Sequence, residues 1–247
     1  MEMETINIHG TGNFQFSGVT PGELENDEYT LVVIADDVSP STGGIRGEAC
    51  EAKKMIIDAC RKSPRAENLL IRMTTFGSSI NEVHGYKPLS EIDESQYKPE
   101  KSIGHSTALY DATYDAVVSA LDYAQRLDND QDILSNAIVF IITDGMDNDS
   151  SKGASSIASK IQASRISEEI ESIRTVLIGI SDPAGGWSSS LDQYLQDFEK
   201  EAKLDQYVPV AEATASKLAK LAEFVSQSIS SQSQSLGSGG PSQGLTF

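Results

Sequence analysis

The stretch Leu31-Val32-Val33-Ile34-Ala35-Asp36-Asp37-Val38-Ser39-Pro40-Ser41 joins an apolar run to a polar end. A continuous apolar run of this length is typical of a strand that is buried on both faces of a parallel sheet. An Asp and two Ser follow at the place where that strand should end. Ligands of parallel α/β sheets bind at the carboxyl ends of the strands. The stretch therefore predicts both a fold class and the position of a site.

Predicted strands and helices alternate along most of the remaining chain. The predicted strands are 31–35, 69–76, 80–86, 137–143, 174–180 and 207–210, and the predicted helices are 49–60, 109–124, 153–170, 191–202 and 215–228. This alternation indicates an α/β protein with a Rossmann-like, doubly wound and mainly parallel central sheet, and helices on both faces. The segment 80–86 is predicted to be one antiparallel edge strand.

The ends of the chain differ in composition from its middle. Residues 1–28 form an acidic arm with no Lys or Arg, and the alternation over 13–16 indicates an edge strand there. Residues 29–229 are predicted to form the domain. Residues 230–247 are rich in Ser, Gly and Gln and are predicted to be a flexible tail.

Charge and cysteine content narrow the classes of partner and compartment. The 247 residues include 37 acidic and 19 basic side chains, for a net charge of −18. This excess of acid argues against nucleic acid and anionic membranes as partners. Cys50 and Cys60 fall in one predicted helix, too far apart for a disulfide, so we expect two reduced thiols. With no secretory signal and no apolar run of membrane-spanning length, the sequence predicts a cytoplasmic protein.

Polar side chains occur at three predicted element ends, and they share one chemistry. Two carboxylates and three hydroxyls supply only oxygen, which suits Mg²⁺ best, with Mn²⁺ or Ca²⁺ as alternatives. The predicted metal-binding residues are Asp37, Ser39, Ser41, Thr107 and Asp144.

At these residues the sequence resembles the von Willebrand factor A (vWA) domain family. The pattern Asp37-x-Ser39-x-Ser41, Thr107 and Asp144-Gly145 matches the family's metal-ion-dependent adhesion site (MIDAS) in order and in strand context, over about residues 29–228. The motifs look most like those of stand-alone prokaryotic members. Two departures are Pro40, where Gly is common, and Thr42, where Met is common.

The resemblance implies a role for each matched residue. Ser39 and Ser41 would bind the metal directly, and Thr107 directly or through water. Asp37 and Asp144 would act through water or by hydrogen bonds to the hydroxyls. An Asp or Glu of a partner protein would fill the open coordination position.

The resemblance also implies a function without catalysis. The chain would be a divalent-metal-dependent protein–protein interaction module, and an accessory or adaptor to a larger assembly. Family-level expectations for that assembly are a MoxR-type AAA+ ATPase or a stress or defence system.

Several other residues are candidates for the rim of the site or for partner contacts. They are Gly104, His105, Gly145, Asp147 and Trp187. His105 is favoured as a loop residue over a ligand, since hard ions prefer oxygen. Asp147 and Asn148 either form a turn or border the metal site. Trp187 either packs locally or contacts a partner.

Two more acids lie close to the motifs. Alternation points Asp36 away from the site, toward a helix or solvent. Asp111 lies one helical turn past Thr107, where it either anchors a neighbouring loop or stays solvated.

Two alternative functions were weighed against the interaction module. A Mg²⁺-dependent phosphohydrolase of the haloacid-dehalogenase type needs Asp-x-Asp after its first strand, but here Ser39 follows Asp37 at that spacing. A structural vWA domain with a vestigial metal site is the other alternative. It would show no stabilisation by metal.

Overall fold

The structure is a computed structural model of the whole chain. It describes residues 1–7, 14–99, 104–167, 170–180, 189–210, 220 and 223–232.

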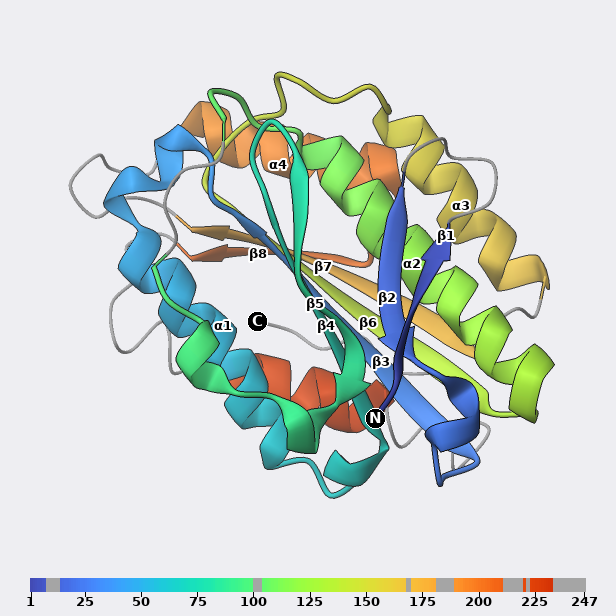
Figure 1. Cartoon of the computed structure of the whole chain (residues 1–247). Coiled ribbons are helices and arrows are strands. Elements are labelled where there is room, and N and C mark those ends of the chain that lie inside the picture. Colours follow the sequence, from blue (N-terminus) through green and yellow to red (C-terminus); the bar gives the residue numbers. More distant parts are fainter. Residues whose placement is uncertain are drawn as a thin grey trace.

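One mixed sheet forms the centre of the described molecule (Figure 1). Its strands lie in the order β1-β2-β5-β4-β3-β6-β7-β8. Their bounds are β1 Met3–Asn7, β2 Gln15–Val19, β3 Glu28–Asp37, β4 Leu69–Phe76, β5 Ile80–Pro88, β6 Leu134–Thr143, β7 Ser172–Ile180 and β8 Gln206–Val210. The run from β4 through β3, β6 and β7 to β8 is parallel, β5 is antiparallel to β4, and β1 is antiparallel to β2.

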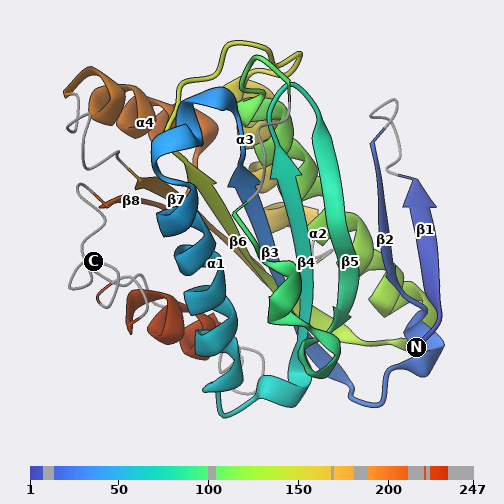
Figure 2. The ribbon, with the colours of Figure 1, turned by 60° about the vertical axis from the view of Figure 1, so that its left-hand side comes forward.

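Helices cover both faces of this sheet (Figures 1 and 2). Their bounds are α1 Arg46–Arg61, α2 Leu109–Gln131, α3 Ala154–Ser167 and α4 Ser189–Ala202, and residues 223–232 are also helical. Side chains of α2, α3 and α4 share one apolar core with the sheet, and α1 shares the opposite core with 223–232. Short 3-10 helices span Pro21–Glu23, Pro40–Gly44, Ala66–Asn68, Leu89–Glu91 and Glu94–Gln96.

Strand β3 shows why the apolar run is continuous. Leu31, Val33 and Ala35 are buried in the core beneath α2, whereas Val32 and Ile34 are buried in the core beneath α1. Successive side chains of a strand point to opposite faces, so a strand covered on both sides needs apolar residues at every position. The same alternation directs the last two residues of β3 to opposite faces.

The prediction of a mainly parallel sheet with helices on both faces is confirmed. The antiparallel edge is formed by β1. The segment predicted for that place, 80–86, lies in β5, which is antiparallel but has β2 on its outer side. Strand β1 was not expected. Its Glu4 accepts two hydrogen bonds of 2.6 Å from the Arg126 side chain. An acid therefore occupies a position where an apolar residue would have indicated a strand.

The described residues test the predictions about the chain ends and the two cysteines only in part. Residues 230–232 of the predicted tail are helical, and 233–247 lie outside the described residues, so the domain boundaries stay predictions. Cys50 and Cys60 are both free and buried in α1. Within the described ranges, no helix has the length and apolar character needed to cross a membrane.

Candidate functional site

The predicted site residues gather at the carboxyl end of the sheet, which is uppermost in Figure 2. Asp37 is the last residue of β3 and Thr143 the last of β6, and the two strands are parallel neighbours. The segments after these strands and the segment before α2 therefore meet over one edge. Three motifs that lie far apart in the sequence become neighbours in this way.

Asp37 is held in place by two donors. Its Oδ1 accepts a hydrogen bond of 2.8 Å from the backbone N–H of Ser39, and its Oδ2 accepts one of 2.6 Å from Oγ1 of Thr143. The side chain is buried, and this burial raises the pKa of the Asp37 carboxyl, while the hydrogen bonds from Thr143 and Ser39 oppose the rise. Both oxygens of this carboxylate thus have fixed directions.

A chain of oxygens leads from Ser39 to the surface. Oγ of Ser39 lies 2.9 Å from Oγ of Ser41, which donates a hydrogen bond of 2.9 Å to Oδ1 of Asp144. Ser39 is buried and Ser41 is exposed. Pro40 is the first residue of the 3-10 helix Pro40–Gly44, where proline has the required φ and gives up no hydrogen bond. The departure at Pro40 is therefore compatible with the contact between the two serines.

Gly145 shows how closely the motifs approach. A Cβ atom added to it would lie 3.4 Å from Oγ of Ser41, 3.8 Å from Oδ2 of Asp37 and 3.8 Å from Oγ1 of Thr107. Oxygens from two motifs thus lie beside a glycine of the third. Gly145 was predicted only as a rim residue, and it lies at the centre of the arrangement.

The position of Thr107 is fixed by Asn148. The backbone N–H of Thr107 donates to Oδ1 of Asn148 at 2.7 Å, and the N–H of Asn148 donates back to the carbonyl of Thr107 at 3.0 Å. The sequence predicts that Asn148 either forms a turn with Asp147 or borders the metal site. It is a positioning residue for the Thr107 hydroxyl.

The same loop caps the amino end of α2. Asp147 accepts a hydrogen bond of 3.1 Å from the N–H of Tyr110, and Oγ of Ser150 accepts one of 2.9 Å from the N–H of Asp111. The Asp111 carboxylate accepts in turn from the N–H groups of Ser151 and Lys152, at 3.0 and 2.8 Å. Asp111 therefore anchors a loop, which was one of its two expected roles. The bonds from Tyr110 and Asp111 satisfy N–H groups at the start of α2 that otherwise lack partners.

Other candidates lie further from the oxygens. Gly104 and His105 are exposed ahead of Thr107. Gly104 has a φ of +72°, and a Cβ there would collide with the Ser78 side chain, so this loop position requires glycine. Trp187 lies outside the described residues.

Asp36 faces α1, as alternation predicted. Its Oδ2 lies 2.6 Å from Nζ of Lys53, and both side chains are 2% exposed. Thr143 was missed as a site residue. The signal for Thr143 was the hydroxyl that ends the otherwise apolar run 137–142.

The donor set fits a small hard cation. Adjacent oxygens around Mg²⁺, each about 2.0–2.1 Å from the metal, are about 3 Å apart, and the spacings from Ser39 to Ser41 and from Ser41 to Asp144 are 2.9 Å. The site combines two acids with hydroxyls. In the described part of the chain, no group of three or more His, Cys, Asp or Glu side chains is placed to hold a metal.

Comparisons with known proteins give similarity at the level of structure. No protein-family model matches the sequence, and no curated protein matches it. The structure is similar to the PilB minor pilin from Streptococcus sanguinis, with a TM-score of 0.58 and 13% identity over 86% of this chain and 63% of that one. It is also similar to a von Willebrand factor type A protein from Catenulispora acidiphila, with a TM-score of 0.51 and 18% identity over 86% of this chain and 44% of that one.

A third similar structure is the pilus adhesin SpaC from Lactobacillus rhamnosus GG, with a TM-score of 0.52 and 12% identity over 82% of this chain and 30% of that one. The chain spans less than two thirds of the length of each of these proteins. At such low identity the similarity shows the fold alone, which is of the von Willebrand factor A type.

Proposed function

We propose that this protein is a metal-dependent interaction module that binds an acidic residue of a partner protein. The observation that carries the proposal is the space beside Gly145, which oxygens of Ser41, Asp37 and Thr107 surround. Asp37 and Ser41 come from one segment, Thr107 from a second and Gly145 from a third, and these segments would have no reason to converge on one point if each only capped its own loop.

Hydroxyl and carboxylate side chains of the chain would have different roles in holding the metal. Ser39, Ser41 and Thr107 would offer neutral hydroxyl oxygens. Asp37 and Asp144 would supply charge, and Asp37 keeps its orientation through Thr143. When bound, a Mg²⁺ ion would supply an electrophilic site that attracts a partner carboxylate, whose desolvation is otherwise costly. The proposed metal is Mg²⁺, with Mn²⁺ and Ca²⁺ as alternatives.

We propose no catalysis at this site. A nucleophilic Ser needs a base within hydrogen-bond reach. Oγ of Ser39 contacts Oγ of Ser41, and Oγ of Ser41 contacts the Asp144 carboxylate. These contacts do not include a His or Lys. A phosphohydrolase of the haloacid-dehalogenase type would also need a second Asp where Ser39 stands.

The proposed partner is a protein that presents an Asp or Glu. The net charge of −18 would repel an acidic partner at long range, and a bound cation would offset that repulsion at the contact itself. An adaptor role beside an AAA+ ATPase, or within a stress or defence system, is a proposal that rests on the family resemblance. In either case the site would act in the cytoplasm.

The first test is thermal unfolding in EDTA and then in excess Mg²⁺ or Mn²⁺. A ligand at one hundred times its dissociation constant stabilises the native state by about 2.7 kcal/mol, and we expect a rise in Tm of several degrees. Asp37→Ala should remove this rise. The matched control is Asp128→Asn, an exposed acid near the other end of α2, which should keep it.

Two outcomes would separate the proposal from its alternatives. If metal does not raise the Tm of the unsubstituted protein, the site is vestigial. A rise that persists in Asp37→Ala would place the metal elsewhere. With a candidate partner such as an AAA+ ATPase, binding should require Mg²⁺ and should be lost when one partner Asp or Glu becomes Asn or Gln.

A further inference from the structure

A cavity lies on the opposite flank of the sheet from α1, between β5 and the amino-terminal hairpin that β1 and β2 form. Strands β2 and β5 pair only at Gly18 and Tyr86, and they separate beyond that point (Figure 2). The separation leaves a cavity of about 430 Å³ lined by residues of β1, β2, β4, β5 and α2. This volume is within the range of pockets that hold small ligands.

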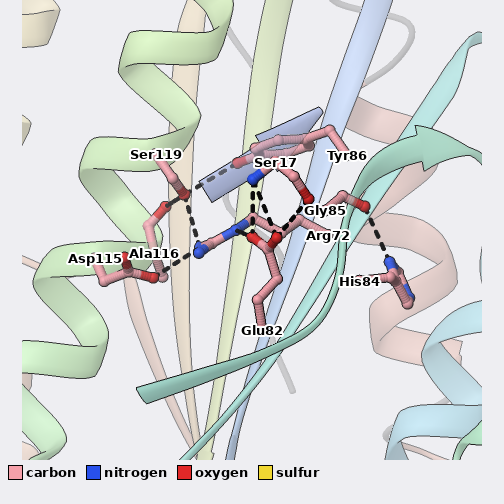
Figure 3. Close-up of polar contacts among 9 residues, drawn as sticks. All are labelled: Ser17, Arg72, Glu82, His84, Gly85, Tyr86, Asp115, Ala116 and Ser119. Atoms are coloured by element: carbon pink, nitrogen blue, oxygen red, sulfur yellow. Dashed lines mark hydrogen bonds and ion pairs between the residues drawn. The ribbon is translucent and has the colours of Figure 1, made fainter. Parts of the chain in front are cut away.

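The floor of the cavity holds a buried guanidinium between two carboxylates (Figure 3). Nε of Arg72 lies 2.9 Å from Oε2 of Glu82, and Nη1 of Arg72 lies 2.7 Å from Oδ2 of Asp115. The side chains of Arg72 and Asp115 are 1% and 3% exposed. Nη1 also donates to Oγ of Ser119 at 3.0 Å. The Arg72 guanidinium thus already has partners within this chain, Glu82 at one edge and Asp115 and Ser119 at the other.

The charges on this floor do not balance. Arg72 is the one basic residue among the described residues that line the cavity, and it faces two acids, Glu82 and Asp115. Glu82 also accepts from the N–H of Ser17 at 3.0 Å and from its hydroxyl at 2.5 Å. Asp115 uses Oδ2 for Arg72. The two carboxylates and one guanidinium therefore carry a net charge of one negative unit. Oδ1 of Asp115 receives no hydrogen bond from the described residues.

The rim supplies neutral hydrogen-bonding groups. Thr5, Gln15 and Asn81 line the cavity, and Gln15 and Asn81 are exposed. The pocket therefore has a polar, uncharged entrance and a negatively charged floor.

We propose that this cavity binds an alkylammonium cation, whose charged end contacts Asp115. A cation there would supply the missing donor to Oδ1 and would balance the second carboxylate. An anion would meet the excess acid, and a neutral ligand would leave the buried charge uncompensated. Burial raises the pKa of Asp115 while Arg72 opposes the rise, as expected for an acid with incomplete compensation.

The test uses two cations with neutral isosteres, in EDTA so that the proposed metal site is not involved. n-Butylammonium represents a free amine, and its neutral control is 1-butanol. N-acetyl-lysine amide represents a partner's side chain, and its neutral control is N-acetyl-norleucine amide. Backbone amide signals of Ser17, Asn81 and Asp115 are followed by NMR. We expect at least one cation to shift them with a dissociation constant of about 1 mM or tighter, and the neutral compounds to leave them unchanged.

Two variants connect the binding to the cavity. Asp115→Asn should weaken the cation at least about tenfold, and Asp128→Asn should not. Because Asp115→Asn also removes a partner of Arg72, Asn81→Trp provides a second variant that blocks the exposed entrance and leaves the ion pairs intact. A preference for the lysine derivative would indicate a protein partner, and equal binding would indicate a small amine.

The proposal is overturned by any of three results. Neither cation shifts the signals at about 10 mM, a concentration well above the expected dissociation constant. A neutral isostere shifts them as strongly as its cation does. Folded Asp115→Asn, or Asn81→Trp, binds as tightly as the unsubstituted protein.

Discussion

Asp36 and Asp37 are neighbours at the end of β3, and their carboxylates have different partners. Asp36 faces α1 and lies 2.6 Å from the Lys53 ammonium, and both side chains are almost fully buried. Asp37 faces the other side and is held by a hydroxyl and a backbone N–H. The first carboxylate has a cation built into the chain. The second has only neutral donors beside it, which is the arrangement expected where a cation comes from outside.

The cavity beside β5 is an intermediate case. The Arg72 guanidinium forms an ion pair with Asp115, and the same guanidinium also forms one with Glu82. Comparing the three sites gives a simple rule for this protein. A buried acid paired one-to-one with a Lys is structural, and a buried acid with less than one cation is a candidate for binding a cation.

The largest predicted effect comes from removing the cation beside Asp36. Lys53→Met should lower the free energy of unfolding by about 3–5 kcal/mol, because it removes the ammonium that lies 2.6 Å from a buried carboxylate. Urea unfolding in EDTA measures the loss. The double variant with Asp36→Asn should recover much of it.

The matched comparison is Asp37→Asn in the same buffer. It should cost less than Lys53→Met, because no ion pair is broken and Asn can still accept one of the two hydrogen bonds. An equal loss in both variants would remove the distinction between the two carboxylates.

The sequence predicted the strand ends better than the connections between side chains. Asp37, Thr107 and Asp144 could be placed together because parallel topology alone brings the ends of β3 and β6 to one edge. Asn148 and Asp111 could not be assigned, because their bonds depend on how the loop 144–152 folds back on α2. That loop path is set by many weak contacts, and no local pattern encodes it.

The alternation over 13–16 predicted a strand where β2 lies, although β2 is not at the edge of the sheet. Strand β1 and the cavity were missed for a related reason. Arg72 stands inside an apolar strand, and its two acids come from β5 and α2, at separations of 10 and 43 residues. Period-2 patterns identify strands by their apolar face. They carry no information about which buried charges will meet.

His84 is a half-buried titratable group that the structure keeps neutral. Its Nδ1 lies 3.0 Å from the carbonyl oxygen of Gly85, so Nδ1–H donates there, and Nε2 accepts from the Tyr97 hydroxyl at 2.7 Å. Burial lowers the pKa of His84 from 6.5 to about 4.

The pKa of His84 predicts a loss of stability in acid. The unfolded chain binds the proton near pH 6.5 and the folded chain only near pH 4, so the free energy of unfolding should fall as the pH drops through this window. The contribution is at most about 3 kcal/mol. Urea unfolding of the unsubstituted protein and of His84→Gln, at several pH values, measures it. The difference between the two should change with pH inside the window and stay constant above pH 7, and a constant difference throughout would contradict the prediction.

The smallest predicted effect on stability is also the most direct test of the space around Asp37. Gly145→Ala places a methyl group 3.4–3.8 Å from oxygens of Ser41, Asp37 and Thr107, which are ordinary contact distances. Gly145 does not have a positive φ, so alanine fits its backbone. In EDTA the variant should therefore unfold within about 0.5 kcal/mol of the unsubstituted protein.

The same methyl group should exclude a cation from that space. We expect Gly145→Ala to weaken Mg²⁺ binding at least about tenfold, which is about 1.4 kcal/mol, as measured by titrating the Mg²⁺-dependent rise in Tm. Gly43→Ala is the matched control, since it lies in the loop after β3 and its added Cβ would have no neighbour within 4 Å. If Gly145→Ala kept full Mg²⁺ affinity, the metal would not occupy the space between the three motifs. If it lost stability in EDTA as well, the space would already be filled by close packing, and the contrast between Asp36 and Asp37 would lose its meaning.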